Sequence, residues 1–166
     1  MKRKVCTWLA SYLPSHPDWP EKMLRSEEAA GFLLIWPIYE QHIFRGFLKE
    51  NDIYDYATHY ERAFPELCID EIVRHFHTRY QNKSTQKNMR FDGRSYEYIL
   101  KKPYEHLSNH DKMRFAMYVV YRYRNNIFHG NKRIEEWPDY EREINDCLQI
   151  MMALMDWHKR NKGELT

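Results

Sequence analysis

The sequence predicts an all-α fold, built as a single bundle of five or six helices. Three observations support this prediction. Apolar residues recur at helical spacing along almost the whole chain, and no segment alternates apolar and polar residues as strands do. The length of 166 residues suits one domain, which we place over residues 1–166. Hydrophobic residues make up 43% of the chain, which is enough for a packed core and excludes a disordered chain.

Residues 1–20 should form a short helix and a connector. The helix is predicted over about Lys4 to Leu13. Three of the seven residues from Pro14 to Pro20 are proline, and they cannot all lie inside a helix. The basic N-terminus is followed by a segment with polar residues and no small-residue cleavage site, so we expect a first helix and no signal peptide.

The second and third helices should follow this connector. Ser26 suits an N-cap position, so the second helix should begin there and run to about Phe47. Pro37 lies inside this helix and predicts a kink or a break. A further short helix is predicted over residues 51–63.

Pro65 should open the next helix. The apolar positions of that helix are predicted to be Leu67, Ile69, Ile72, Val73, Phe76 and Tyr80. Residues 81–95 are rich in Asn, Lys, Ser and Gln, and they predict a polar loop.

The helix after this loop should be central in the bundle. Ser108 or Asn109 suits its N-cap, and Gly130 suits the position just past its end. Residues 115–121 are apolar almost all round, which is typical of a buried helix. Arg124 falls on the apolar stripe, where a guanidinium needs a partner or a functional reason for partial burial.

The last helix should begin at Pro138. Acidic residues come first in it and basic residues come last, as the helix dipole favours. Its buried stripe is predicted to contain Tyr140, Ile144, Cys147, Leu148, Met151, Leu154 and Met155.

Charge is distributed unevenly although the net charge is only +2. Residues 101–133 hold eight basic and two acidic side chains, whereas residues 134–166 hold four basic and eight acidic ones. A basic segment of this kind suits a surface that binds a polyanion. Solvated helix faces of opposite sign are the alternative interpretation.

The sequence also indicates where the protein acts. The longest apolar run, Ala29 to Trp36, is too short to cross a bilayer, so we expect no membrane partner. Cys6, Cys68 and Cys147 are odd in number and far apart, which predicts reduced thiols and a cytoplasmic location.

No metal site and no cofactor are predicted. His75 and His77 point to different faces of a helix. His106 and His110 have the spacing of a zinc pair, but Asp111 alone is a poor third ligand. The chain has no glycine-rich phosphate loop.

One motif combines side chains that can act together on a phosphodiester. Arg124 and His129 are five residues apart, so they lie within about 140° of each other around a continuing helix. Histidine exchanges protons near neutral pH, and arginine binds phosphate through paired donors. Asn125 and Asn126 add amide donors or orient the ring. Because no carboxylate cluster is near, this chemistry is expected to be independent of metal.

The segment from Arg124 to His129 resembles the signature of the HEPN superfamily (higher eukaryotes and prokaryotes nucleotide-binding). That signature is Arg-x4–6-His at a helix end, usually with a polar residue directly after the arginine, and the close resemblance covers about residues 115–131. It implies an HEPN-like bundle that cleaves RNA without metal to a 2′,3′-cyclic phosphate and a 5′-hydroxyl. His129 would be the general base on the ribose 2′-hydroxyl, Arg124 would bind the scissile phosphate, and Asn125 would support them. Many members of the family are toxins or effectors in bacterial defence.

Side chains around the motif are candidates for substrate binding. They are Asn126, Arg122, Lys132 and Tyr121. Tyr118, Tyr121 and Tyr123 could stack on bases, although core or dimer contacts are the stronger interpretation. The resemblance also implies a homodimer, in which two-fold symmetry supplies a second His129 as general acid.

Two other interpretations stay open. A catalytically silent HEPN-like adaptor would bind a nucleotide or a protein partner, such as a nucleotidyltransferase-type antitoxin. In a purely structural interpretation, His129 caps the helix end and Arg124 pairs with a core carboxylate, for which the candidates are Glu61, Glu71 and Glu143.

Overall fold

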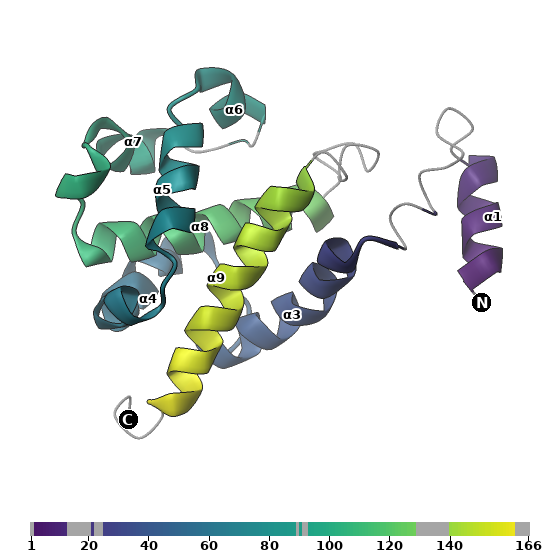
Figure 1. Ribbon diagram of the computed structural model, residues 1–166, viewed down its shortest axis with the longest axis horizontal. Coiled ribbons are helices and arrows are strands. Elements are labelled where there is room, and N and C mark those ends of the chain that lie inside the picture. Colours follow the sequence, from purple (N-terminus) through teal and green to yellow (C-terminus); the bar gives the residue numbers. More distant parts are fainter. Residues whose placement is uncertain are drawn as a thin grey trace.

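Every regular element that the structure describes is a helix (Figure 1). The computed structural model describes residues 2–12, 21, 25–88, 90, 93–128 and 140–161. The α-helices in these ranges are α1 (Lys2–Tyr12), α3 (Glu27–Ile43), α4 (Ile53–Tyr60), α5 (Asp70–Arg79), α6 (Lys83–Asn88), α7 (Gly93–Lys101), α8 (Asn109–Phe128) and α9 (Glu141–Arg160). Short 3-10 helices are η1 (Glu50–Asp52), η2 (Glu61–Glu66) and η3 (Tyr104–His106). The all-α prediction is confirmed, and the eight described α-helices exceed the five or six expected.

The helix α8 is the centre of the bundle. It packs against α4, α5, α7 and α9, while α3 packs along α9. Figure 1 shows α9 crossing α8, with α3 beside α9 and α1 set apart from the other helices. Residues 115–120 of α8 are all buried, which confirms the prediction that this helix is central.

One hydrophobic core joins six of the described helices. It runs from Phe32 to Trp157 and includes side chains of α3, α4, α5, α7, α8 and α9. The predicted stripe of the last helix lies in this core, with Tyr140 and Met155 half-buried at its margin. Gly31 of α3 brings that helix close to α9, since a Cβ at this position would lie 3.3 Å from Leu148.

The predicted helix starts at Ser26 and Ser108 are confirmed by hydrogen bonds. The Ser26 hydroxyl accepts from the backbone N–H of Ala29 at 3.1 Å, and the Ser108 hydroxyl accepts from the backbone N–H of Asp111 at 3.0 Å. Of the two candidates for the cap of α8, Ser108 is therefore the one observed.

The helix α3 differs from its prediction at two places. It continues through Pro37 as one helix, so no break occurs there. It ends at Ile43 and does not reach Phe47. The cause is the backbone: Arg45 has φ +53° and Gly46 has φ +147°, and both values lie outside the helical region.

The region after α4 is more finely divided than expected. Pro65 lies inside η2 and does not open a long helix, and α5 begins only at Asp70. Between them, Cys68 has φ +55°, which ends the 3-10 helix and redirects the chain.

The predicted polar loop over residues 81–95 is wrong. It contains α6 and the start of α7. Asn82 caps α6, because its side-chain oxygen accepts from the backbone N–H groups of Ser84 and Thr85. The sequence of α6 is polar throughout, so no apolar stripe marks it.

Several predicted positions fall outside the described residues. They are the connector at residues 14–20, Gly130 and Pro138. None of the described helices is both long enough and apolar enough to cross a membrane.

Candidate functional site

The candidate motif begins near the end of α8. Arg124, Asn125 and Asn126 lie within this helix, which extends to Phe128. His129 and Lys132 lie outside the described residues. The expected approach of His129 to Arg124 therefore stays a prediction.

Arg124 is half-buried and lies against two aromatic rings. Its guanidinium carbon is 5.5 Å from the ring centre of Trp36 and 5.4 Å from that of Phe47. Its Nη1 donates to Oδ1 of Asn125 at 2.9 Å. Trp36 is buried and Phe47 is exposed, so the guanidinium lies between the core and the surface. The partner that the sequence predicts for the partly buried guanidinium of Arg124 is thus supplied by two cation–π contacts and an amide.

The other predicted substrate-binding residues differ in their exposure. Asn126 is only 1% exposed, which fits a positioning role for its amide better than direct contact with a substrate. Arg122 is 12% exposed at its side chain, and its Nη1 lies 4.0 Å from a carboxylate oxygen of Glu50. Tyr121 is half-buried against the core, while Tyr118 and Tyr123 lie fully within it. The core interpretation of the latter two tyrosines is confirmed.

A row of half-buried side chains leads back from the motif along α8. Arg114, Tyr121 and Asn125 are separated by seven and four residues, which places them on one face of the helix. All three are neither fully buried nor fully exposed. The row is therefore open to solvent at its edge and joins the motif to the middle of α8.

The segment from Phe47 to Tyr54 runs along the half of α8 that carries Arg114, Arg122 and Arg124. Three contacts join the segment to α8: Phe47 with Arg124, Glu50 with Arg122, and Tyr54 with Arg114. Their order along the segment is the reverse of their order along α8. The segment around η1 is therefore antiparallel to α8 and lies against its three arginines.

A pocket of about 140 Å³ lies where this segment reaches Arg114. It is lined by Glu50, Asn51, Tyr54, Tyr96 and Arg114. The residues come from η1, α4, α7 and α8, so no local sequence pattern could indicate the pocket.

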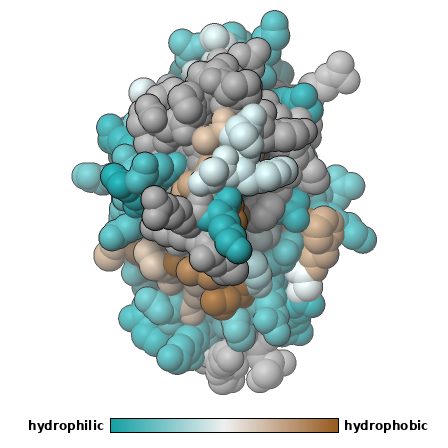
Figure 2. All heavy atoms as spheres, turned by 90° about the vertical axis from the view of Figure 1, so that its right-hand side faces the viewer, coloured by the Kyte–Doolittle hydropathy of each residue, from teal (hydrophilic) through white to brown (hydrophobic). Residues whose placement is uncertain are grey.

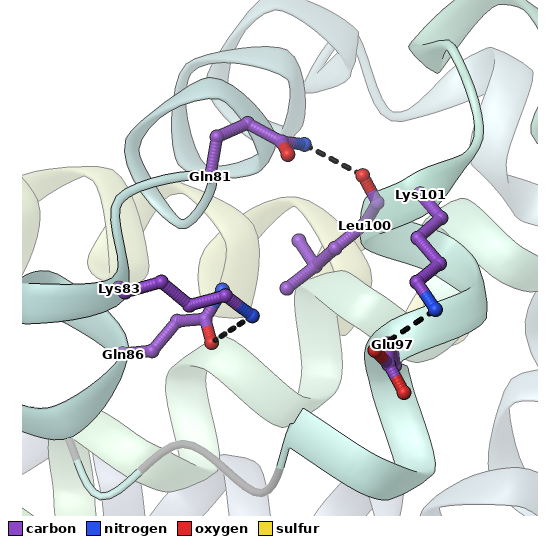
Figure 3. A pocket seen from close by; sticks show the side chains of 6 residues that line it. All are labelled: Gln81, Lys83, Gln86, Glu97, Leu100 and Lys101. Carbon is purple, nitrogen blue, oxygen red and sulfur yellow. Dashed lines mark hydrogen bonds and ion pairs between the residues drawn. The ribbon is translucent and has the colours of Figure 1, made fainter.

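A larger pocket of about 300 Å³ lies between α6 and α7 (Figure 3). Its polar groups mainly bind one another. Gln81 donates to the Leu100 carbonyl at 2.8 Å, and Lys101 pairs with Glu97 at 2.9 Å. Such a pocket offers few unused groups to a ligand.

Acidic residues partly neutralise the basic segment, and three of these four residues lie outside it. The ion pairs, with their N–O distances, are Lys101 with Glu97 (2.9 Å), Lys102 with Asp111 (3.5 Å), Lys112 with Asp70 (2.8 Å) and Arg122 with Glu50 (4.0 Å). Arg114 differs from these, because no carboxylate among the described residues lies within 4.0 Å of it. The charge available to a polyanion is therefore less than the sequence indicates.

The histidines that could resemble metal ligands have other surroundings. His77 is buried, and its Nε2 lies 3.0 Å from the Ile99 carbonyl oxygen. The His110 ring packs against Tyr54, with ring centres 4.8 Å apart. In the described ranges, no group of three or more His, Cys, Asp or Glu side chains is arranged to hold a metal ion.

Glu143 was one possible core partner for Arg124. The structure pairs it with Arg79 of α5, at 2.9 Å.

Comparison of the chain with protein-family models, with curated proteins and with solved structures finds no match. The resemblance to the HEPN superfamily therefore rests on the motif from Arg124 to His129 alone.

Proposed function

We propose that the protein is a metal-independent endoribonuclease of HEPN-like type. The observation that supports this proposal is the setting of Arg124. Its guanidinium lies against Trp36 and Phe47 and is bound on one side by Asn125, at the end of a row of half-buried side chains. A cation held in this way is oriented before a phosphate arrives, which is what stabilisation of a phosphoryl transition state requires.

Each residue of the motif has a defined part in the proposed reaction. The outer N–H groups of Arg124 bind the non-bridging oxygens of the scissile phosphate. Asn125 holds the guanidinium through its side-chain oxygen. His129 removes the proton of the ribose 2′-hydroxyl, whose oxygen then attacks the neighbouring phosphorus and displaces the 5′-oxygen of the next nucleotide. The products are a 2′,3′-cyclic phosphate and a 5′-hydroxyl.

The proposal extends to partners. A homodimer would bring a second His129 as the general acid that protonates the leaving oxygen. A role as a toxin or defence effector, restrained by an antitoxin, belongs to the same proposal.

The decisive experiment is RNA cleavage in the presence of EDTA. We expect the wild type to cut RNA and leave cyclic phosphate ends, and His129→Ala to lose cleavage by at least 100-fold while staying folded. Arg124→Lys keeps the charge but loses the planar, paired donors, so it should also lose most activity.

A matched control exists for the arginine variant. Arg62 also lies over a tryptophan, Trp157, at 5.6 Å, but it lies outside α8. Arg62→Lys should therefore cut RNA at the wild-type rate. The proposal is contradicted if His129→Ala still cuts RNA. It is also contradicted if the folded wild type does not cut RNA.

A second candidate function is a silent adaptor that binds a protein. The observation that favours it is an exposed apolar face on α3, where Leu33, Leu34 and Ile38 are 43%, 71% and 48% exposed. Figure 2 shows hydrophobic side chains gathered in the lower half of one face of the molecule. Exposed apolar groups of this kind often mark binding surfaces.

Three variants separate the adaptor from the nuclease. For an adaptor, Leu34→Glu should release a protein that co-purifies with the wild type, whereas His129→Ala should retain it. Met152→Glu, at a 41% exposed position on α9, is the matched control and should also retain the partner.

A further inference from the structure

Three tyrosines surround the guanidinium of Arg114 on α8. The guanidinium carbon lies 4.7 Å from the ring centre of Tyr96, 5.3 Å from that of Tyr54 and 5.8 Å from that of Tyr98. Tyr96 is buried and stacks on Tyr118, with ring centres 3.8 Å apart. Tyr54 and Tyr98 are 54% and 38% exposed. The cluster therefore has a fixed aromatic base and two rings that reach solvent.

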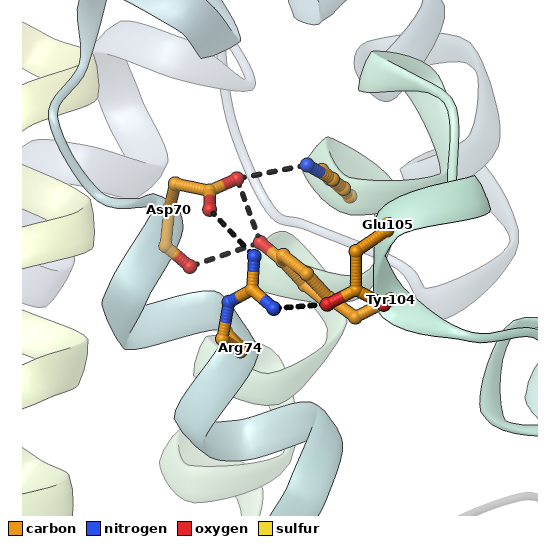
Figure 4. A network of polar contacts seen from close by, with 5 residues as sticks. Asp70, Arg74, Tyr104 and Glu105 are labelled. Carbon is orange, nitrogen blue, oxygen red and sulfur yellow. Dashed lines mark hydrogen bonds and ion pairs between the residues drawn. The ribbon is translucent and has the colours of Figure 1, made fainter.

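Arg74 provides an internal comparison (Figure 4). Its guanidinium also lies over a tyrosine, Tyr104, at 4.5 Å. However, it forms ion pairs with Glu105 and with Asp70, so its charge is used within the protein. The two arginines share the aromatic contact and differ in their acidic partners.

The polar contacts of Arg114 leave its charge largely available. Its Nη1 donates to the Tyr98 hydroxyl at 3.0 Å, and that hydroxyl donates to Asp111 at 2.8 Å. Asp111 itself lies 3.5 Å from Lys102, so it is already balanced by a cation. Among the described residues no carboxylate contacts Arg114 directly, which leaves its positive charge for an anion from outside.

The pocket beside Arg114 is small and has a polar edge. Its volume of about 140 Å³ is below the roughly 300–1,000 Å³ of sites that take a drug-sized molecule, so it fits a single ring system. Glu50 and Asn51 lie at its border with a carboxylate and an amide. An aromatic face, hydrogen-bonding groups and a nearby cation are the features that bind an unpaired nucleobase with its phosphate.

We infer that this pocket binds one nucleotide of single-stranded RNA. The base stacks on Tyr54 with its edge toward Glu50 and Asn51, and the phosphate binds Arg114. This inference deepens the proposed function and rests on it for the identity of the ligand. Arg114 precedes Arg124 by ten residues, which is about 15 Å along α8, so the bound nucleotide lies a few nucleotides from the scissile phosphate.

Binding to an RNA that cannot be cut tests this inference separately from cleavage. The probe is a fluorescein-labelled single-stranded oligonucleotide with 2′-O-methyl riboses, measured by fluorescence anisotropy. We expect Tyr54→Ala to raise Kd at least fivefold, because one stacked base is lost. Arg114→Gln should raise Kd and reduce the slope of log K against log salt by about 0.7, as expected for one lost phosphate contact. The matched control, Arg74→Gln, should bind as the wild type does.

A second probe separates the base from the phosphate. Polyphosphate has no base, so Arg114→Gln should weaken its binding and Tyr54→Ala should leave it unchanged. Tyr54→Leu keeps an apolar side chain without the aromatic face, and it should behave as Tyr54→Ala does on both probes. Circular dichroism and thermal melting verify that each variant is folded.

The possible outcomes distinguish the pocket from the nuclease. If the wild type binds the oligonucleotide through Tyr54 and Arg114 but cuts no RNA, the inferred nucleotide pocket is supported and the proposed nuclease activity is contradicted. If the wild type cuts RNA while Tyr54→Ala and Arg114→Gln bind the oligonucleotide as tightly as the wild type does, the inferred pocket is contradicted and the proposed nuclease activity is supported. Absence of binding by the wild type also overturns the inference.

Discussion

The ion pair between Arg79 and Glu143 joins the end of α5 to the start of α9. The two charged groups are 2.9 Å apart, and the side chains are 33% and 8% exposed. Arg79 lies in the last turn of its helix and Glu143 in the first turn of its own, where the helix dipoles favour these charges. We expect Arg79→Met to destabilise the fold because it leaves the Glu143 carboxylate buried without its cation.

The size of the loss follows from this geometry. At 2.9 Å and an effective dielectric constant of 20, the attraction is roughly 6 kcal/mol before the cost of desolvation. Breaking a fully buried pair costs about 3–5 kcal/mol. Because one third of Arg79 is exposed, water partly replaces it, and we expect a loss of about 2 kcal/mol. For a chain of this length, that is a fall in Tm of about 4–8 °C.

A double-mutant cycle in urea measures the pair directly. Arg79→Met and Glu143→Gln, alone and together, should give a coupling energy of about 1–2 kcal/mol. The same cycle with Arg124→Met and Glu143→Gln should give less than about 0.5 kcal/mol, since Glu143 is paired elsewhere. A larger coupling of Glu143 to Arg124 than to Arg79 would refute the reasoning and restore the structural interpretation of Arg124.

Further predictions concern two acidic groups and one packing position. Burial opposes the charged form of Asp70, but hydrogen bonds led by that from Lys112 outweigh it and lower the pKa of Asp70. The contribution of Asp70 to stability is therefore present above the unfolded carboxyl pKa of about 3.9 and is lost as pH falls through the lower folded pKa. In urea titrations Asp70→Asn should cost up to about 1 kcal/mol at pH 7, and the cost should vanish once pH is below both carboxyl pKa values. Burial raises the pKa of Asp146, so this carboxylate opposes folding at neutral pH. Asp146→Asn should therefore raise the urea midpoint of unfolding at pH 7. The gain should vanish once pH is below the carboxyl pKa of both the folded and the unfolded state. At Gly31, alanine should change stability by less than about 1 kcal/mol, because the gain in helix propensity offsets crowding of Leu148. Gly31→Val should lower stability by about 1–3 kcal/mol in thermal melts.

Local rules account for the parts of the fold that the sequence predicts well. The start of α3 at Ser26 and the central place of α8 follow from capping and from apolar periodicity. The same rules fail for α6, whose polar sequence leaves no stripe to detect. They also fail at Arg45, where a positive φ ends α3 early, because apolar periodicity alone does not show which non-glycine residue adopts a left-handed conformation.

The site shows the same division between local and distant information. The position of Arg124 on the apolar stripe predicts that it needs a partner. The identity of those partners is not local, since Trp36 and Phe47 are more than 70 residues away in sequence. Likewise Tyr54, Tyr96 and Arg114 meet only through the packing of three helices, so the pocket could not be predicted.

The central position of α8 has a consequence for heat inactivation. This helix supplies both the axis of the core and the two arginines proposed to bind RNA, Arg114 and Arg124, so these contacts cannot be lost by local unfolding while the core stays folded. Loss of RNA binding on warming should therefore coincide with cooperative unfolding of the whole bundle. Amide hydrogens of α8 should in turn be among the slowest in the chain to exchange.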